Sequence, residues 1–226
     1  METSLHRQLK QLYAVEGAGQ EIRLGKFRID VVRGEQLIEI QHGSLAAIRT
    51  KIEYLLPKYQ VLVVKPLVVR KHLVQCSEKD GPEESRRLSP KKGSILSLFD
   101  ELIYFARVFP HPNLILETPL VEIEEWRFAG HGRRRRWRRN DFQVADQKLV
   151  QLISVERFRT SSDLLRLIPR TLPSPFHTGH LADSMGIRRW VAQRIAYCLR
   201  HTRAVKTVGK SGNSHLYQLR RSKKAA

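Results

Sequence analysis

The alternation of apolar and polar positions predicts six elements, in the order α-β-β-β-α-β, within the first 65 residues. Helices are expected where apolar residues recur every three or four positions, and the first three strands where they alternate with polar residues. The continuous apolar run Val61–Val64 is typical of a buried central strand. The predicted elements are the helices 4–14 and 45–55 and the strands 21–24, 27–32, 36–41 and 61–64.

The pattern is less regular in the middle of the chain. Residues 77–93 are polar and contain Gly and Pro, which predicts a loop. Residues 95–105 have the apolar spacing of an amphipathic helix, and residues 113–128 read as a strand. An arginine-rich loop is expected at 131–140, and a connector at 141–159.

From residue 160 the pattern changes to short helices followed by a hairpin. Thr160 is expected to cap the first helix, and Gly186 to provide the positive φ of the turn between the second and third helices. The third helix is predicted over 188–201, followed by strands at 204–208 and 215–219 around a glycine-rich basic loop. This order resembles winged helix-turn-helix domains, which implies a DNA-binding helix and a DNA-contacting wing.

The third helix has one apolar stripe and one basic stripe. Its predicted buried residues are Ile187, Val191, Ile195, Cys198 and Leu199. Its predicted exposed residues are Arg189, Gln193, Ala196 and Arg200, flanked by Arg188 and Arg194. Arginines there suit phosphate contacts and Gln193 suits a base edge, with Lys206 and Lys210 as the contacts of the wing.

Composition and charge narrow the classes of function. The chain has 226 residues, 41% of them hydrophobic, and no apolar run near the roughly 20 residues that span a bilayer. Its first residues lack a secretory signal, and its two cysteines suit a reducing cytoplasm, so we expect a cytoplasmic protein. We find no P-loop, no Gly-x-Ser-x-Gly elbow and no zinc spacing among the histidines, so an NTPase, a serine hydrolase and a zinc protein are not supported.

The positive charge is concentrated in the C-terminal part of the chain. Residues 1–126 contain 18 Lys and Arg against 17 Asp and Glu, whereas residues 127–226 contain 23 against five. Such a segment attracts polyanions, and nucleic acid is the first expectation. RNA is an alternative to DNA, and a winged helix that binds proteins is an alternative to both.

Six arginines surround one tryptophan within the arginine-rich loop. This run is expected to grip a nucleic-acid backbone or enter a minor groove, with the tryptophan stacking on an unpaired base. A solvated basic loop and a nuclear localisation signal have the same composition. The residues are Arg133, Arg134, Arg135, Arg136, Trp137, Arg138 and Arg139.

Two carboxylates carry the candidate chemistry of the N-terminal part. Asp30 and Glu39 lie on strands that a short turn pairs, and Gln41 shares the face of Glu39 because side chains alternate along a strand. Hard oxygen ligands of this kind suit Mg²⁺ (or Mn²⁺), which polarises a phosphodiester and activates a water molecule. The alternative is a hairpin whose polar ends are simply solvated.

The α-β-β-β-α-β order, with Phe27–Asp30 followed by Leu37–Gln41, resembles the PD-(D/E)XK nuclease superfamily. Glutamine in place of the usual lysine is similar to the E-x-Q variant of the competence protein CoiA, and the small fold is similar to Holliday-junction resolvases. The resemblance implies that Asp30, Glu39 and Gln41 are catalytic, with Asp30 and Glu39 as metal ligands. By analogy with resolvases and winged helices it also implies a homodimer.

The resemblance leaves two positions open. Many members have a glutamate on the first helix that faces the metal; Glu2 is the candidate, with Glu16 and Glu21 as rivals. The absent lysine removes a positive charge that stabilises the transition state, which Arg49 or Lys51 could supply.

The sequence therefore predicts a bacterial, nucleoid-associated protein with two domains. Residues 1–140 are expected to form a restriction-endonuclease-like α/β domain with a mixed sheet and a core at 1–65, and residues 160–226 a winged helix. The predicted function is DNA binding with metal-dependent phosphodiester hydrolysis. The alternative is a DNA-binding transcriptional regulator whose nuclease-like domain is inactive.

Overall fold

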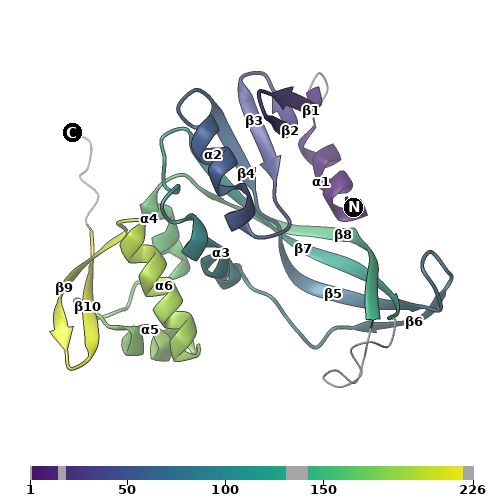
Figure 1. Cartoon of the computed structure of the whole chain (residues 1–226). Helices are drawn as coiled ribbons and strands as arrows, with labels where there is room; N and C mark the ends of the chain where they lie inside the picture. Colours follow the sequence, from purple (N-terminus) through teal and green to yellow (C-terminus); the bar gives the residue numbers. More distant parts are fainter. Residues whose placement is uncertain (1, 15–18, 131–141, 221–226) are drawn as a thin grey trace. The chain divides into compact units, whose positions relative to one another are not determined.

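The structure is a computed structural model, which describes residues 2–14, 19–130 and 142–220. The arginine run predicted to bind nucleic acid therefore lies outside the described residues. The fold is of the α/β class and has a mixed central sheet (Figure 1). Its helices are α1 Ser4–Tyr13, α2 Arg49–Leu55, α3 Leu98–Phe105, α4 Ser161–Leu164, α5 Thr178–Met185 and α6 Arg189–His201, with the 3₁₀ turns η1 Leu45–Ile48, η2 Ile95–Ser97 and η3 Leu165–Leu167.

The central sheet contains eight strands in the order β1-β2-β3-β4-β7-β5-β6, and β8 pairs with β7. The pairs β1–β2, β2–β3 and β5–β6 are antiparallel, whereas β5 and β7 are parallel. The strands are β1 Gly19–Leu24, β2 Phe27–Arg33, β3 Gln36–Ile40, β4 Gln60–Val64, β5 Leu67–Cys76, β6 Glu83–Leu88, β7 Leu114–Ala129 and β8 Phe142–Phe158. A separate hairpin consists of β9 Val205–Ser211 and β10 Ser214–Leu219.

The chain forms two compact units. Unit 1 comprises residues 1–42, 64–95 and 118–156, and unit 2 comprises residues 43–63, 96–117 and 157–226. Unit 2 thus combines the C-terminal segment with two stretches from the first half of the chain. An independent domain over 160–226 stays a prediction.

In unit 1, α1 packs on strands β2 and β3. Thr3 begins the helix, because its side chain accepts a hydrogen bond from the His6 amide. Leu5 and Leu9 are fully buried, as expected for residues four positions apart on one helix face. Ile29, Val31 and Ile38 are among the buried side chains of the β2–β3 hairpin.

Two predictions about the middle of the chain need correction. Residues 83–88 of the predicted loop form the edge strand β6, whose six residues are all exposed. Residues 142–158 of the predicted connector form β8. Both strands carry many polar side chains, and an edge strand needs little apolar character because only one side of it is paired.

In unit 2, α5 and α6 pack together, and α3 packs on α6. Phe99, Phe105, Ile195 and Leu199 are buried there. Thr160 and Asp163 form a capping box at the start of α4, as the sequence predicted for Thr160.

Gly186 provides the left-handed turn between α5 and α6, as predicted, with φ 61° and ψ 33°. We expect Gly186→Ala to lower the free energy of unfolding by about 1 kcal/mol, because an alanine in this region is strained by its Cβ. Urea denaturation measures the change. Gly209→Ala is the matched control, since no positive φ is found there and its nearest neighbour would be the Leu216 side chain at 3.9 Å. Equal stability of the two variants would contradict the prediction.

Candidate functional site

Asp30 and Glu39 lie on neighbouring strands, as predicted. The antiparallel register pairs Val31 with Ile38, and Asp30 and Glu39 are the next positions along β2 and β3. The Asp30 carboxylate accepts a hydrogen bond from the Ile40 amide at 2.8 Å, and its Oδ2 lies 3.5 Å from His6 Nε2 on α1. Glu39 is buried, with 7% of its surface exposed. Asp30 thus contacts both β3 and α1.

Two of the candidates for a third metal ligand, Glu2 and Glu21, form ion pairs with a lysine. Lys10 Nζ lies 2.5 Å from a Glu2 oxygen and 2.7 Å from a Glu21 oxygen. Burial lowers the pKa of Lys10, but its hydrogen bonds with Glu2 and Glu21 outweigh this and raise the pKa above its usual value. Lys10 therefore stays charged and holds both carboxylates, and Glu16 lies outside the described residues.

Gln41 lies where β3 meets the end of β4. Its backbone N–H donates a hydrogen bond to the Val64 carbonyl at 2.9 Å. Lys65, the residue after Val64, is 3% exposed, and its ammonium donates a hydrogen bond to the His42 carbonyl at 2.9 Å. Burial, followed by the charges of Lys65 and Lys71, lowers the pKa of His42. Lys65 is not among the residues predicted from the sequence, although a lysine directly after the apolar run of β4 signals a buried charge.

The described residues bring no group of three metal ligands together. Among residues 2–14, 19–130 and 142–220, no three His, Cys, Asp or Glu side chains lie close enough together to hold a metal ion. Asp30 is hydrogen-bonded to the β3 backbone, and Glu2 is paired with Lys10. The described donors therefore do not fit a Mg²⁺ ion with three protein ligands.

In unit 2, the exposed face of α6 is broader than predicted. Arg189, Gln193 and Arg200 are exposed as expected, whereas Ala196 is 1% exposed, so its predicted exposure is wrong. Trp190 and Tyr197 are 48% and 38% exposed and extend the exposed surface of α6 beyond the predicted stripe. Their spacing from Gln193, three residues before and four after, was the signal in the sequence.

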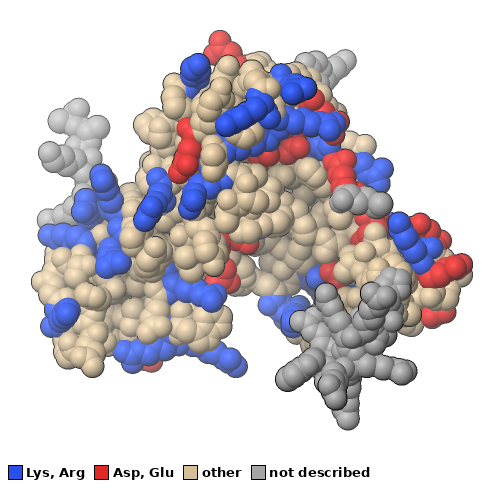
Figure 2. Space-filling view, in the orientation of Figure 1, with Lys and Arg blue, Asp and Glu red and all other residues tan. Residues whose placement is uncertain are grey.

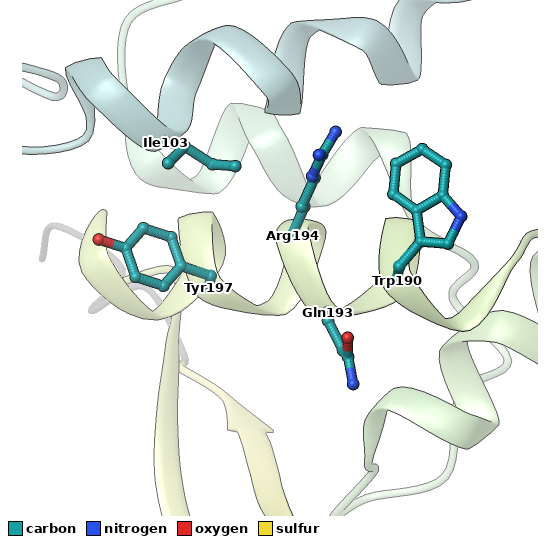
Figure 3. A pocket seen from close by; sticks show the side chains of 5 residues that line it. All are labelled: Ile103, Trp190, Gln193, Arg194 and Tyr197. Atoms are coloured by element: carbon teal, nitrogen blue, oxygen red, sulfur yellow. The ribbon is translucent and has the colours of Figure 1, made fainter.

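A cavity of about 410 Å³ lies along this face of α6, next to Ile103 of α3. Figure 3 shows that Trp190, Arg194 and Tyr197 project to one side of α6 while Gln193 projects to the other. The Arg194 guanidinium pairs with Asp100 at 2.5 Å and lies 4.6 Å from the centre of the Trp190 ring. Arg194 is therefore held by two protein partners, and its role as a flanking DNA contact stays a prediction.

The β9–β10 hairpin follows α6 and presents Lys206 and Lys210, which are both exposed. Gly212 forms its turn with φ 55°. Arg189 Nη2 donates to Ser214 Oγ at 3.2 Å, which links the start of α6 to the start of β10.

Basic side chains far outnumber acidic ones in this segment. Residues 160–220 contain ten Lys and Arg but only two Asp and Glu. Figure 2 shows Lys and Arg over α5, α6 and the hairpin with almost no acidic side chains, whereas both signs are interspersed over α1 and the first three strands. A polyanion is the ligand that such a surface attracts.

One histidine and the cysteine of this segment have structural roles. The His177 side chain caps α5 by accepting hydrogen bonds from the Gly179 and His180 amides. Cys198 donates to the Phe99 carbonyl, and burial raises the pKa of its thiol to about 12. A thiol of this kind is unreactive.

The sequence matches the model of a domain of unknown function, DUF8091, over residues 3–159. The chain belongs to this family. The DUF8091 match includes α1 and all eight strands of the central sheet, and it ends before Thr160. An uncharacterized protein of Treponema pallidum (strain Nichols) is 30% identical over 219 residues, which cover 96% of this chain and 85% of the relative. The similarity to this relative thus extends beyond the DUF8091 region. No solved structure matches the chain.

Proposed function

We propose that this DUF8091 protein binds DNA through a winged helix formed by residues 160–220. The observation that supports this best is the basic, acid-poor surface that α6 shares with the β9–β10 hairpin. A helix of 13 residues is long enough to lie in a major groove, where Gln193 would reach a base edge. The hairpin would place Lys206 and Lys210 on the adjacent phosphates.

Phosphate contacts would supply most of the affinity. Arg188, Arg189, Arg200, Lys206 and Lys210 are all exposed and come from two consecutive elements. Each contact with a phosphate releases condensed counterions, so the affinity falls steeply as salt rises.

Metal-dependent phosphodiester hydrolysis is the second candidate function. It is favoured by the adjacent positions of Asp30 and Glu39 and by the cationic Lys65 beyond β4. The Ile40 amide on Asp30 and the lack of a third ligand among the described residues count against it. DNA binding without cleavage, as in a transcriptional regulator, is therefore the function that the geometry supports better.

The remaining proposals concern the setting of the protein. We place it at the bacterial nucleoid in the cytoplasm, as a homodimer, with DNA preferred over RNA. Among the described residues, no helix is both long and apolar enough to cross a membrane.

Two measurements on the full chain test the proposed function and separate it from the second candidate. The first is binding to a fluorescent DNA duplex in EDTA and in Mg²⁺ or Mn²⁺, with an RNA duplex as competitor. We expect the same affinity with and without metal, and weaker competition by RNA. Binding that is unaffected by salt would contradict a phosphate-based interface.

The second measurement is cleavage of supercoiled plasmid and of a four-way junction by the wild-type protein and by Glu39→Ala. We expect no metal-dependent cleavage by either protein. Cleavage that requires metal and disappears in Glu39→Ala would establish the nuclease instead. Glu53→Ala is the matched control, because Glu53 is an exposed glutamate of α2.

A further inference from the structure

A second basic surface lies in unit 1, in a groove of about 580 Å³ beside β5. Four cations line it: Lys71 from β5, Arg127 from β7, and Lys91 and Lys92 from the segment that follows β6. None of these residues belongs to α6 or the hairpin. The strands β5, β7 and β8, which carry much of the groove, are neighbours in the sheet (Figure 1).

The wall that carries Lys91 and Lys92 is fixed to the edge of β5. The Ser89 amide donates to the Lys71 carbonyl at 2.8 Å, and the Gly93 amide donates to the Val69 carbonyl at 3.2 Å. A Cβ atom at Gly93 would come within 2.1 Å of the Val68 carbonyl oxygen, so glycine is needed for this close approach. The two lysines between these anchors are exposed.

The floor of the groove holds two cations in place through one buried carboxylate. Glu125 accepts from Lys71 Nζ at 2.6 Å and from Arg127 Nε at 2.8 Å. The Arg127 guanidinium also lies 3.8 Å from the centre of the Phe142 ring. Arg127 uses Nε and Nη2 for Glu125, which leaves Nη1 on the opposite side of the group. A ligand would therefore meet donors that are already ordered.

The charge and the size of the groove indicate the ligand. With Glu125 included, the four cations leave three net positive charges around the groove. A volume of about 580 Å³ lies within the range of roughly 300–1,000 Å³ found for small-ligand pockets. A single strand fits, because phosphates can follow the cations one after another.

We propose that this groove binds the phosphodiester backbone of single-stranded nucleic acid. The inference goes beyond the proposed function, because it assigns a second site to unit 1 that does not depend on α6.

The test is the affinity of the full chain for a fluorescent 20-nucleotide oligo-dT in EDTA. We expect Lys91→Glu/Lys92→Glu to weaken binding at least about tenfold and to lower the salt slope by about 1.4, because two phosphate contacts are lost. Lys91→Gln/Lys92→Gln should give a smaller loss in the same direction. Lys58→Glu/Lys79→Glu is the matched control, since both lysines are exposed and lie outside the groove.

The outcomes separate the groove from the proposed winged helix. Unchanged oligo-dT affinity in Lys91→Glu/Lys92→Glu, relative to the control, would overturn the inference and leave DNA binding by α6 intact. Loss of oligo-dT binding in this variant would support binding by the groove. This conclusion would hold whether or not substitutions in α6 weaken the binding of duplex DNA. Equal losses in the groove variant and the control would show a general effect of net charge and would also overturn the inference.

Discussion

Replacing Arg188 and Lys210 with glutamate is expected to weaken duplex DNA binding about 100-fold at moderate salt. Both side chains are exposed, one at the start of α6 and the other in β9. Each substitution removes a phosphate contact and adds a like charge to the interface, so the salt slope should also fall by about 1.8. Fluorescence anisotropy over a range of salt concentrations measures both quantities.

The substitutions should leave the fold intact. Arg188 is the N-cap residue of α6, where a negative side chain interacts favourably with the helix dipole. Lys58→Glu/Lys79→Glu carries the same change in net charge and is the control. A double variant that binds duplex DNA as tightly as this control would remove the main support for the winged-helix proposal.

Gln193→Ala distinguishes recognition of the DNA sequence from electrostatic attraction to the phosphates. Its amide can contact a base edge but carries no charge, so the salt slope should stay as in the wild type. The preference among duplexes of different sequence should decrease instead. A competition assay with several duplexes measures this preference. A lower salt slope would show that Gln193 contributes to phosphate contacts.

The fold could be predicted where local pattern and tertiary packing agree. The helix 4–14, the strands of the β2–β3 hairpin and the turn at Gly186 appear where the sequence placed them. Each has a local cause: an apolar spacing of four in α1, alternation in the strands, and a residue that tolerates positive φ. Strand β6 could not be found in this way, because all six of its residues are exposed.

The candidate sites show the same limit more sharply. The sequence places Asp30 beside Glu39, since a short turn fixes the register of the hairpin. It does not show that Lys10 binds Glu2 and Glu21, because this depends on how α1 is positioned over β1. The burial of Ala196 could not be predicted for a similar reason. Ala196 lies at the border between the buried and the exposed face of α6, and only packing decides on which side such a residue lies.

The network around Glu125 depends even more on tertiary structure. Its carboxylate on β7 contacts Lys71 on β5 and Gln147 on β8, which are 54 and 22 residues away in the sequence. No local pattern relates these positions. The sheet order brings them together, and the resulting cluster supports the floor of the basic groove.

Glu125→Gln is expected to lower the free energy of unfolding by about 3 kcal/mol at neutral pH. The carboxylate is 6% exposed and accepts from Lys71, Arg127 and Gln147. A neutral amide would leave Lys71 and Arg127, which are 27% and 19% exposed, without their counter-charge, and removing one partner of a largely buried ion pair is costly. Urea denaturation measures the loss.

Glu124→Gln is the matched control on the same strand. Glu124 pairs with Arg86, whose side chain is 45% exposed, so the loss should stay below about 1 kcal/mol. A loss in Glu125→Gln no larger than in this control would show that the network contributes little to folding.

The pH dependence of the stability tests whether the charge of Glu125 causes the loss. Burial raises the pKa of Glu125, but the hydrogen bonds from Lys71, Arg127 and Gln147 outweigh it and lower the pKa below the usual 4.5. A carboxyl group with a lowered pKa stabilises the fold fully above its unfolded pKa, and this stabilisation is lost as the pH falls through the folded pKa. The wild type should therefore be more stable than Glu125→Gln near pH 7, and the gap should narrow steadily below pH 4.5. A gap that stays constant from neutral pH down to about pH 3 would attribute the effect of the substitution to packing, because a charge effect has to narrow once the carboxyl of the unfolded state begins to protonate.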